Sequence, residues 1–134
     1  MIRDLWKYVC VGFGGALGTI LRFWLSGLIA QAYGERFPMG TLVINVTGSF
    51  IIGIVATLTG PDGRLMVGSI PRQFFMIGIC GGYTTFSSFS LQTLNLAREG
   101  QWGYAALNVG LSLLLCLLGV WLGFLAGETL NRSV

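Results

Sequence analysis

The chain has 134 residues, of which 54% are hydrophobic and only 10% charged, and its formal net charge is +3. This composition excludes an ordinary soluble domain and indicates a membrane protein. The small and dispersed positive charge also argues against a nucleic-acid-binding surface.

Long gaps between the charged residues predict the membrane spans. A bilayer core about 30 Å thick needs about 20 consecutive apolar residues in a helix. Residues 37–61, 73–97 and 100–127 carry no charge, and residues 8–34 carry only Arg22. We therefore expect an all-α membrane protein, a single domain over residues 1–134, with four transmembrane helices at about 6–32, 39–59, 71–97 and 102–127.

The first predicted span contains closely spaced glycines followed by an arginine. Gly14 and Gly18 form a small-xxx-small face, which favours close contact with another helix. Arg22 lies about 24 Å along the helix from Trp6 at 1.5 Å per residue, which places it near the far side of the membrane. Two interpretations remain open: an interfacial arginine that snorkels, and a guanidinium that lines the entrance of an anion pathway.

The second predicted span has a polar stripe. Thr41, Asn45 and Ser49 recur every four residues, so they share one helical face. An amide buried in hydrocarbon must find hydrogen-bond partners. Asn45 therefore either joins two helices by a hydrogen bond or presents its NH₂ donor to a hydrated pathway, and the rarity of asparagine in such a span favours the second interpretation.

The third predicted span holds the segment GICGGYTTFSSFS, residues 78–90. Gly81 and Gly82 predict an interruption of the helix at mid-membrane, and the hydroxyls of Thr84 and Thr85 are expected to cap its restart. Irregular backbone at that depth is tolerated where it is buried in protein or lines a cavity, and its carbonyls then become cation ligands. The alternative is a kinked helix whose hydroxyls bond to their own i−4 carbonyls.

Two phenylalanines follow the hydroxyl-rich segment. Phe86 and Phe89 are three residues apart, so both project from one side of the restarted helix. Core packing or lipid contact is the ordinary role of such residues in a membrane helix. The alternative is electrostatic, because the positive edge of an aromatic ring attracts a small anion without a formal charge.

The fourth predicted span carries a second polar stripe and a glycine face. Asn108, Ser112 and Cys116 lie at four-residue intervals. The glycines of the span repeat the small-xxx-small spacing, which predicts tight helix packing; they are Gly119, Gly123 and Gly127.

The residues that the spans lack exclude several functions. The chain has no histidine, and no Asp or Glu lies within a predicted span, whereas a proton-coupled transporter needs a titratable group in the membrane. No nucleophile–base pair or phosphate loop is visible, so we expect no enzyme. Neutral donors suit an anion that must bind and then leave, which points to a small dimeric anion channel. Basic residues divide five against three between the two sides, a near balance that permits an antiparallel dimer.

Three segments resemble the Fluc (CrcB-type) fluoride channels: GGALGTILRF at 14–23, GTLVINVTGSF at 40–50 and GGYTTFSSFS at 81–90. The resemblance in length and number of spans covers the whole chain. It implies a multi-pass protein of the cell (inner) membrane, in contact with lipid, that forms a dual-topology homodimer of antiparallel subunits with two pores at the interface.

The same resemblance implies roles for particular residues. Arg22 would lie near the aqueous vestibule, and the backbone carbonyls of Gly81 and Thr84 would bind a structural Na⁺ on the two-fold axis. The fluoride pathway would be formed by polar side chains and two rings, namely Thr41, Asn45, Phe86, Ser88, Phe89, Asn108 and Ser112. Cys116 takes a place where a serine can occur in relatives.

The implied function is passive fluoride export down the electrochemical gradient, which confers fluoride resistance. Fluoride is strongly hydrated, so asparagine, serine and threonine donors and ring edges must replace its water in a narrow pore. Two other hypotheses are a small proton-coupled multidrug exporter, which would need the membrane carboxylate that this chain lacks, and a non-transporting membrane scaffold.

Overall fold

The computed structural model describes residues 2–133 and is helical throughout its regular secondary structure. The four longest elements are α1, α2, α5 and α6, and three short segments lie between α2 and α5. In chain order the elements are α1 (Ile2–Tyr33), α2 (Met39–Leu58), α3 (Ser69–Gln73), the π-helix η1 (Phe74–Cys80), α4 (Gly81–Tyr83), α5 (Phe86–Arg98) and α6 (Trp102–Arg132).

Four helical stretches are long and apolar enough to cross a membrane: Asp4–Tyr33, Met39–Leu58, Ser69–Arg98 and Trp102–Arg132. This confirms the prediction of an all-α fold with four such helices. The third stretch is assembled from α3, η1, α4 and α5. The fourth extends past the predicted end at residue 127 and includes Glu128, whose carboxylate pairs with Arg132 at 3.3 Å in the last turn.

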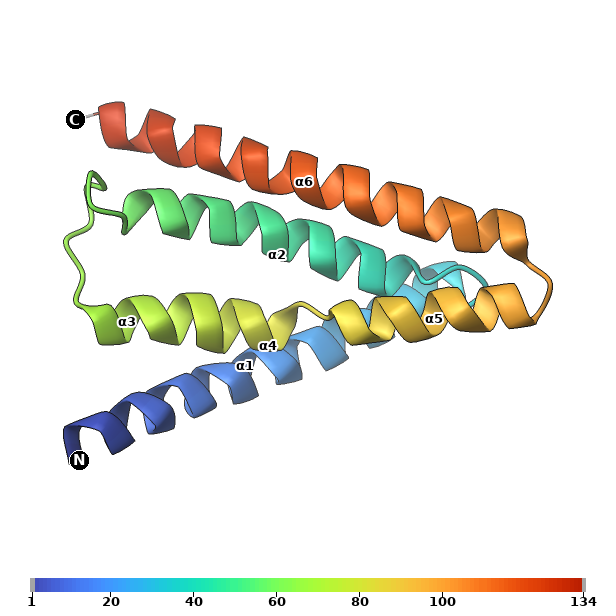
Figure 1. The fold of residues 1–134 in the computed structure, drawn as a ribbon, viewed down its shortest axis with the longest axis horizontal. Helices are drawn as coiled ribbons and strands as arrows, with labels where there is room; N and C mark the ends of the chain where they lie inside the picture. Colours follow the sequence, from blue (N-terminus) through green and yellow to red (C-terminus); the bar gives the residue numbers. More distant parts are fainter. Residues whose placement is uncertain (1, 134) are drawn as a thin grey trace.

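The helices form two pairs that run in opposite directions (Figure 1). α2 and α6 lie side by side along most of their length and run the same way, and this is the most extensive contact in the structure. α1 crosses the segment formed by η1 and α4 at an angle, also in a common direction. The N-terminus of α1 and the C-terminus of α6 lie at the same end of the bundle, as an even number of spans requires (Figure 1).

Glycines bring α1 against the third stretch. A Cβ on Gly14 would lie 2.7 Å from the Phe74 carbonyl oxygen, and one on Gly78 would lie 3.1 Å from the Gly14 Cα. A Cβ on Gly18 would collide with the Ile79 carbonyl oxygen. The predicted small-xxx-small contact of α1 is therefore confirmed, and larger residues at these positions would force the two backbones apart.

Glycines on the other pair produce an equally close approach. A Cβ on Gly123 would collide with the Phe50 carbonyl oxygen, and one on Gly119 would lie 3.0 Å from the Val46 carbonyl oxygen. Gly53 of α2 makes the reciprocal contact with α6, 2.5 Å from the Val120 carbonyl oxygen to its added Cβ. The tight packing predicted for the fourth span is confirmed.

The third stretch changes conformation twice. After the short α-helix α3 it becomes a π-helix, η1, which sequence reasoning did not predict. Thr84 and Thr85 then adopt extended conformations, with φ and ψ of −80° and 158° and of −154° and 106°, before α5 begins at Phe86. Gly81 and Gly82, expected to interrupt the helix, are instead helical and belong to α4. The non-helical residues are the two threonines that follow them.

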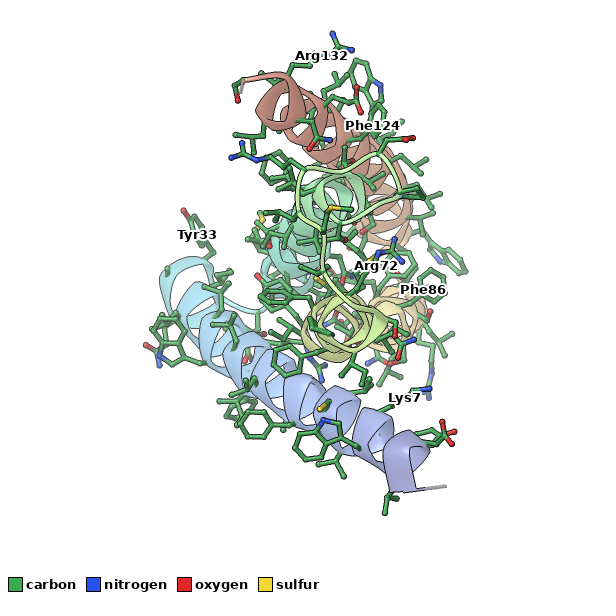
Figure 2. All side chains as sticks on the ribbon, turned by 90° about the vertical axis from the view of Figure 1, so that its left-hand side faces the viewer. Lys7, Tyr33, Arg72, Phe86, Phe124 and Arg132 are labelled. Carbon is green, nitrogen blue, oxygen red and sulfur yellow. The ribbon has the colours of Figure 1, made fainter. Side chains whose placement is uncertain are left out.

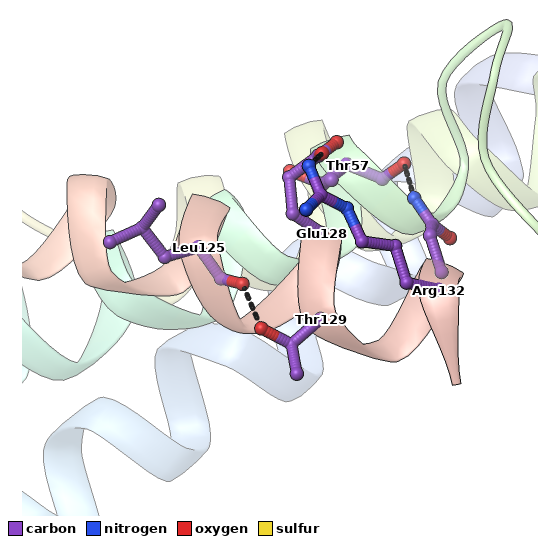
Figure 3. A network of polar contacts seen from close by, with 6 residues as sticks. Thr57, Leu125, Glu128, Thr129 and Arg132 are labelled. Atoms are coloured by element: carbon purple, nitrogen blue, oxygen red, sulfur yellow. Dashed lines mark hydrogen bonds and ion pairs between the residues drawn. The ribbon is translucent and has the colours of Figure 1, made fainter.

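Polar contacts close the end of the bundle that holds the termini of α1 and α6. The guanidinium of Arg64 donates to the Leu130 carbonyl at 2.9 Å, which satisfies a carbonyl in the last turn of α6. Arg72 donates to the Thr59 hydroxyl at 3.2 Å, at the end of α2. Within the last turns of α6, Thr129 donates to the Leu125 carbonyl and Arg132 pairs with Glu128 (Figure 3). These contacts join the α2–α3 loop to both helices.

Candidate functional site

A groove of about 370 Å³ runs between α2, the α4–α5 region and α6. It combines apolar and polar side chains, which suits a site that orients a small ligand with few polar groups. Six residues that the sequence assigns to the site line this groove: Asn45, Gly81, Thr84, Phe86, Phe89 and Ser112. The helices thus bring residues from three of the predicted spans together.

Asn45 of α2 pairs with the backbone of Thr85. Its Nδ2 donates to the Thr85 carbonyl at 3.0 Å, and its Oδ1 accepts from the Thr85 N–H at 2.8 Å. The side-chain amide of Asn45 therefore bonds to both the carbonyl and the N–H of Thr85, which have no helical partners at this position. An Asn amide has two N–H donors, so one N–H of Asn45 is left for the groove.

The two phenylalanine rings meet at the edge of the groove. The centroids of Phe86 and Phe89 lie 5.3 Å apart, with an interplanar angle of 50°. Phe89 is 8% exposed, whereas Phe86 is 74% exposed and projects from the side of the bundle (Figure 2). Phe89 is therefore packed within the chain, and the ring of Phe86 is free to contact lipid or another molecule.

Hydroxyl groups surround the start of α5. The Thr85 hydroxyl accepts from the Ser88 N–H at 3.2 Å, which makes Thr85 the N-cap of α5 and confirms the predicted cap. The same hydroxyl donates to the Ser88 hydroxyl at 2.9 Å. Thr84 does not cap α5, because its hydroxyl donates back to the Cys80 carbonyl at 2.9 Å. Ser112 of α6 is 8% exposed and faces the groove from the opposite side.

Asn108 lies outside the residues that line the groove and is 1% exposed. Its Nδ2 donates to the Thr93 hydroxyl at 2.9 Å, and that hydroxyl donates to the Phe89 carbonyl at 2.8 Å. Sequence reasoning missed Thr93. The available signal was its position one helical turn after Phe89, which places a hydroxyl next to a site residue.

Thr41 lines a separate hollow of about 290 Å³. It is 7% exposed and lies one turn before Asn45 on α2. This hollow lies beside the α1–α2 link and contains charged and polar residues, including Glu35, Arg36, Gln92 and Asn95. The polar stripe predicted on the second span thus joins two recesses of the molecule.

Arg22 contacts the third stretch. Its Nε donates to the Gly82 carbonyl at 3.2 Å, and the Thr19 hydroxyl of the same helix reaches that carbonyl at 3.4 Å. Gly82 belongs to α4, next to the extended threonines. A guanidinium beside the carbonyl end of a helix is electrostatically favourable. The contact places Arg22 beside the interior of the third stretch, and Arg22 does not line the groove.

The ligand chemistry of the described residues is restricted. Residues 2–133 contain no cluster of three or more His, Cys, Asp or Glu side chains that would hold a metal ion. Gly81 and Thr84, whose backbone carbonyls the sequence analysis assigns to a cation, both line the groove. Carbonyl oxygens are ligands for hard cations.

The fold and groove describe a small membrane protein whose four spans surround neutral polar groups, and the chain matches a known family of this kind. Residues 9–124 match the family described as "CrcB-like protein, Camphor Resistance (CrcB)". A "Fluoride-specific ion channel FluC" of Rhodospirillum rubrum is 63% identical over 127 residues, which cover 95% of this chain and 98% of the relative.

Two further relatives carry the same description. The protein from Opitutus terrae is 63% identical over 124 residues, covering 92% of this chain and 94% of the relative. The protein from Paramagnetospirillum magneticum is 59% identical over 125 residues, covering 93% of this chain and 98% of the relative. The chain belongs to the CrcB-like family, which confirms the resemblance found in its three motifs.

Proposed function

We propose that this protein is a fluoride-selective ion channel of the membrane. The observation that carries the proposal is the 63% identity over 95% of the chain to a protein named as a fluoride-specific channel. The relatives are channels by name, so the expectation that the chain is not an enzyme agrees with them. Its four apolar helices make it a multi-pass membrane protein, which in bacteria resides in the inner membrane.

Passive export is the mode of transport that the charges favour. The acidic residues of the chain lie at helix ends and in links, and Glu128 pairs with Arg132. Proton coupling requires a titratable group inside the membrane. The proton-coupled exporter is therefore the weaker alternative. A passive pore lets fluoride leave a cell down its electrochemical gradient and so confers fluoride resistance.

The working unit in this proposal is an antiparallel homodimer with two pores. Phe86 is 74% exposed at the edge of the groove, so a single chain leaves the ring outside its own packing. A second, oppositely oriented copy would cover the ring and close the groove on its open side. The near balance of basic residues supports this arrangement, because it permits insertion in both directions.

The fluoride pathway in this proposal follows the groove. Asn45 contributes the N–H that Thr85 leaves free, Ser112 contributes a hydroxyl, and ring edges contribute positive potential from Phe86 and Phe89. Ser88 does not line the groove and would contribute its hydroxyl from beside Thr85. Neutral donors replace part of the water around fluoride without trapping it. Thr41 would continue the pathway into the second hollow and Arg22 would act near the vestibule, while Asn108 would act from behind Phe89 through Thr93.

We also propose that the interruption at Thr84 and Thr85 lies at mid-membrane and holds a structural Na⁺ on the dimer's two-fold axis. The fit rests on the donor set. Among residues 2–133, no hydrogen-bond donor reaches the carbonyl oxygens of Gly81 or Thr84, and both residues line the groove. Neutral oxygen ligands suit a hard monovalent cation. When bound, the ion would supply positive charge that joins two subunits.

Fluoride release from proteoliposomes, followed with a fluoride electrode, tests the function. We expect downhill release of fluoride, little release of chloride, and no dependence on an imposed pH gradient. A requirement for the pH gradient would favour the proton-coupled exporter. No release of any anion by correctly inserted protein would favour a scaffold and would reject the channel.

A further inference from the structure

Two backbone N–H groups at the interruption donate to side chains and not to the carbonyls that a continuous helix would give them. In an α-helix the N–H of residue i bonds to the carbonyl of residue i−4. The N–H of Thr85 would thus bond to Gly81 and the N–H of Ser88 to Thr84. Instead, Thr85 donates to Asn45 Oδ1 at 2.8 Å and Ser88 donates to Thr85 Oγ1 at 3.2 Å.

The carbonyls deprived of these donors are those of Gly81 and Thr84. Within the described chain no other donor replaces the lost ones, and both residues line the groove. Tyr83 also loses its helical donor, since Ser87 lies beyond the interruption, but Tyr83 does not line the groove. The two unpaired carbonyls at the groove are therefore the ones that the N–H groups of Thr85 and Ser88 would have reached in a continuous helix.

Three nearby carbonyls, those of Cys80, Gly82 and Thr85, have hydrogen-bond donors. Cys80 accepts from the N–H of Thr84 at 3.0 Å and from its hydroxyl at 2.9 Å. Gly82 accepts from Arg22 at 3.2 Å, and Thr85 accepts from Asn45 at 3.0 Å. Arg22 of α1, Asn45 of α2 and Thr84 itself thus satisfy the carbonyls of Gly82, Thr85 and Cys80, so specific side chains help to set which oxygens at the groove stay free.

We infer that the Asn45 amide oxygen and the Thr85 hydroxyl are positioning groups that keep the carbonyls of Gly81 and Thr84 free to bind a monovalent cation. Each group accepts an N–H that would otherwise close a helical hydrogen bond. Without that acceptor, the N–H would turn to the carbonyl four residues earlier, because an unpaired donor away from water is costly. The inference rests on the proposed sodium site and gives Thr85 a role beyond capping α5.

The test for Thr85 is the substitution Thr85→Val, which keeps the shape of the side chain and removes its hydroxyl. We expect the carbonyl ¹³C resonance of Thr84, measured by NMR of the full chain in lipid nanodiscs without sodium, to move in the direction of hydrogen bonding. A sodium titration at constant ionic strength should then show the midpoint at Thr84 raised about ten-fold, the effect of about one lost ligand contact.

Two matched variants accompany it. Thr85→Ser restores a hydroxyl at the same position and should return both the resonance and the sodium midpoint to the wild-type values. Ser90→Ala removes a hydroxyl from the same helix, one that donates to the Phe86 carbonyl at 2.9 Å and accepts no diverted N–H. It should leave Thr84 unchanged, which separates the proposed role from a general loss of hydroxyls in α5.

The test for Asn45 uses two substitutions and the carbonyl resonance of Gly81. Asn45→Leu removes the acceptor for the Thr85 N–H, so the Gly81 carbonyl should become hydrogen-bonded. Asn45→Asp keeps an oxygen acceptor, so the Gly81 carbonyl should stay free. If Asn45→Leu fails to fold, the Thr85 series decides the question by itself.

The inference is overturned if Thr85→Val leaves the Thr84 resonance and the sodium midpoint unchanged, or if sodium moves neither carbonyl of the wild type. It is also overturned if sodium shifts Gly82 as strongly as Gly81 and Thr84. Fluoride release by the wild type is measured separately. Sodium binding with the expected variant pattern but without fluoride release would reject the channel and leave this inference standing.

Discussion

Glycine packing brings α2 against α6, and it also brings α1 against the third stretch. The two contacts differ in the regularity of the helices that they join. In both, an added Cβ would meet a backbone carbonyl of the facing helix, as at Gly123 and Gly18. Yet α2 and α6 are uninterrupted helices, whereas the helix facing α1 contains a π-helical segment and two extended residues. Close packing is therefore compatible with both regular and irregular backbone.

The hydroxyl groups show the difference most clearly. Ser49 and Thr57 of α2 donate to the carbonyls four residues earlier in their own helix, at 2.7 and 2.8 Å, so their hydroxyl donors are used within α2. The Thr57 side chain also packs against Gly127 of α6. Thr85 accepts an N–H from Ser88 and donates to its hydroxyl. The α2–α6 contact is therefore a scaffold built on close glycine packing, whereas the polar groups of the groove come from α2, the third stretch and α6 together.

The largest expected effect on fluoride release comes from replacing the two aromatic rings at the groove. Replacing Phe86 or Phe89 with isoleucine should lower fluoride release about 100-fold, ~2.7 kcal/mol in the barrier, because an aliphatic side chain has no positive ring edge. The dimer should remain assembled by size-exclusion chromatography. Phe23→Ile makes the same chemical change on α1, where Phe23 is 83% exposed, and should conduct normally. Undiminished release in both groove variants would contradict the ring-edge role.

The scaffold contact is tested by adding a methyl group to it. Gly123→Ala should lower the free energy of unfolding by about 2 kcal/mol, because the new Cβ would collide with the Phe50 backbone. Fluoride release per folded dimer should change little, since Gly123 does not line the groove.

Gly110→Ala is the control for this substitution. It lies on the same helix with no atom within 4 Å of an added Cβ, so alanine there should be neutral or slightly stabilising. Thermal unfolding in detergent measures both variants. Equal effects of the two substitutions would show that the close approach of α2 and α6 is not what stabilises this pair.

Replacing the Asn45 amide is expected to lower fluoride release less than replacing either ring. Asn45→Asp loses the N–H donors and adds a negative charge, and should lower fluoride release about ten-fold, ~1.4 kcal/mol. Asn131→Asp adds the same charge at the end of α6, outside the groove, and should not change release. Normal conduction by Asn45→Asp liposomes would show that the amide donor is not needed.

The four helices could be predicted because the charges other than Arg22 lie near their ends or in the links between them. The glycine contacts could be predicted as well, since the spacing of Gly14 and Gly18 depends only on helix geometry. The predicted position of the interruption was wrong by a few residues. Gly82 is helical despite the low helix propensity of glycine, and it packs so closely that an added Cβ would collide with the Gly15 carbonyl oxygen.

The polar partners were harder to predict than the helices. Asn45 could be identified as a buried amide, but its pairing with Thr85 depends on how α2 packs against the interruption. The distance of Arg22 along its helix predicted a position near the membrane surface, but gave no indication of its contact with the Gly82 carbonyl. Such contacts follow from tertiary packing and leave no periodic signal in the sequence.

The smallest expected effect concerns Thr93, which links α5 to Asn108 of α6. Thr93→Val should lower the free energy of unfolding by about 0.6 kcal/mol, the average for such hydrogen bonds between membrane helices. A double-mutant cycle with Asn108→Leu should give a coupling of similar size, measured by thermal unfolding. Zero coupling would mean that the 2.9 Å contact contributes nothing measurable.

The same cycle, repeated with fluoride release as the readout, separates scaffold from pathway. Thr93 donates to the Phe89 carbonyl, so a loss of the Asn108–Thr93 bond reaches the ring only through the backbone of α5. If Asn108 acts in this way, Thr93→Val and Asn108→Leu should reduce release equally and the double variant no further. If Asn108→Leu reduces release far more than Thr93→Val, its amide serves the anion directly, and the α5–α6 contact belongs to the pathway as well as to the scaffold.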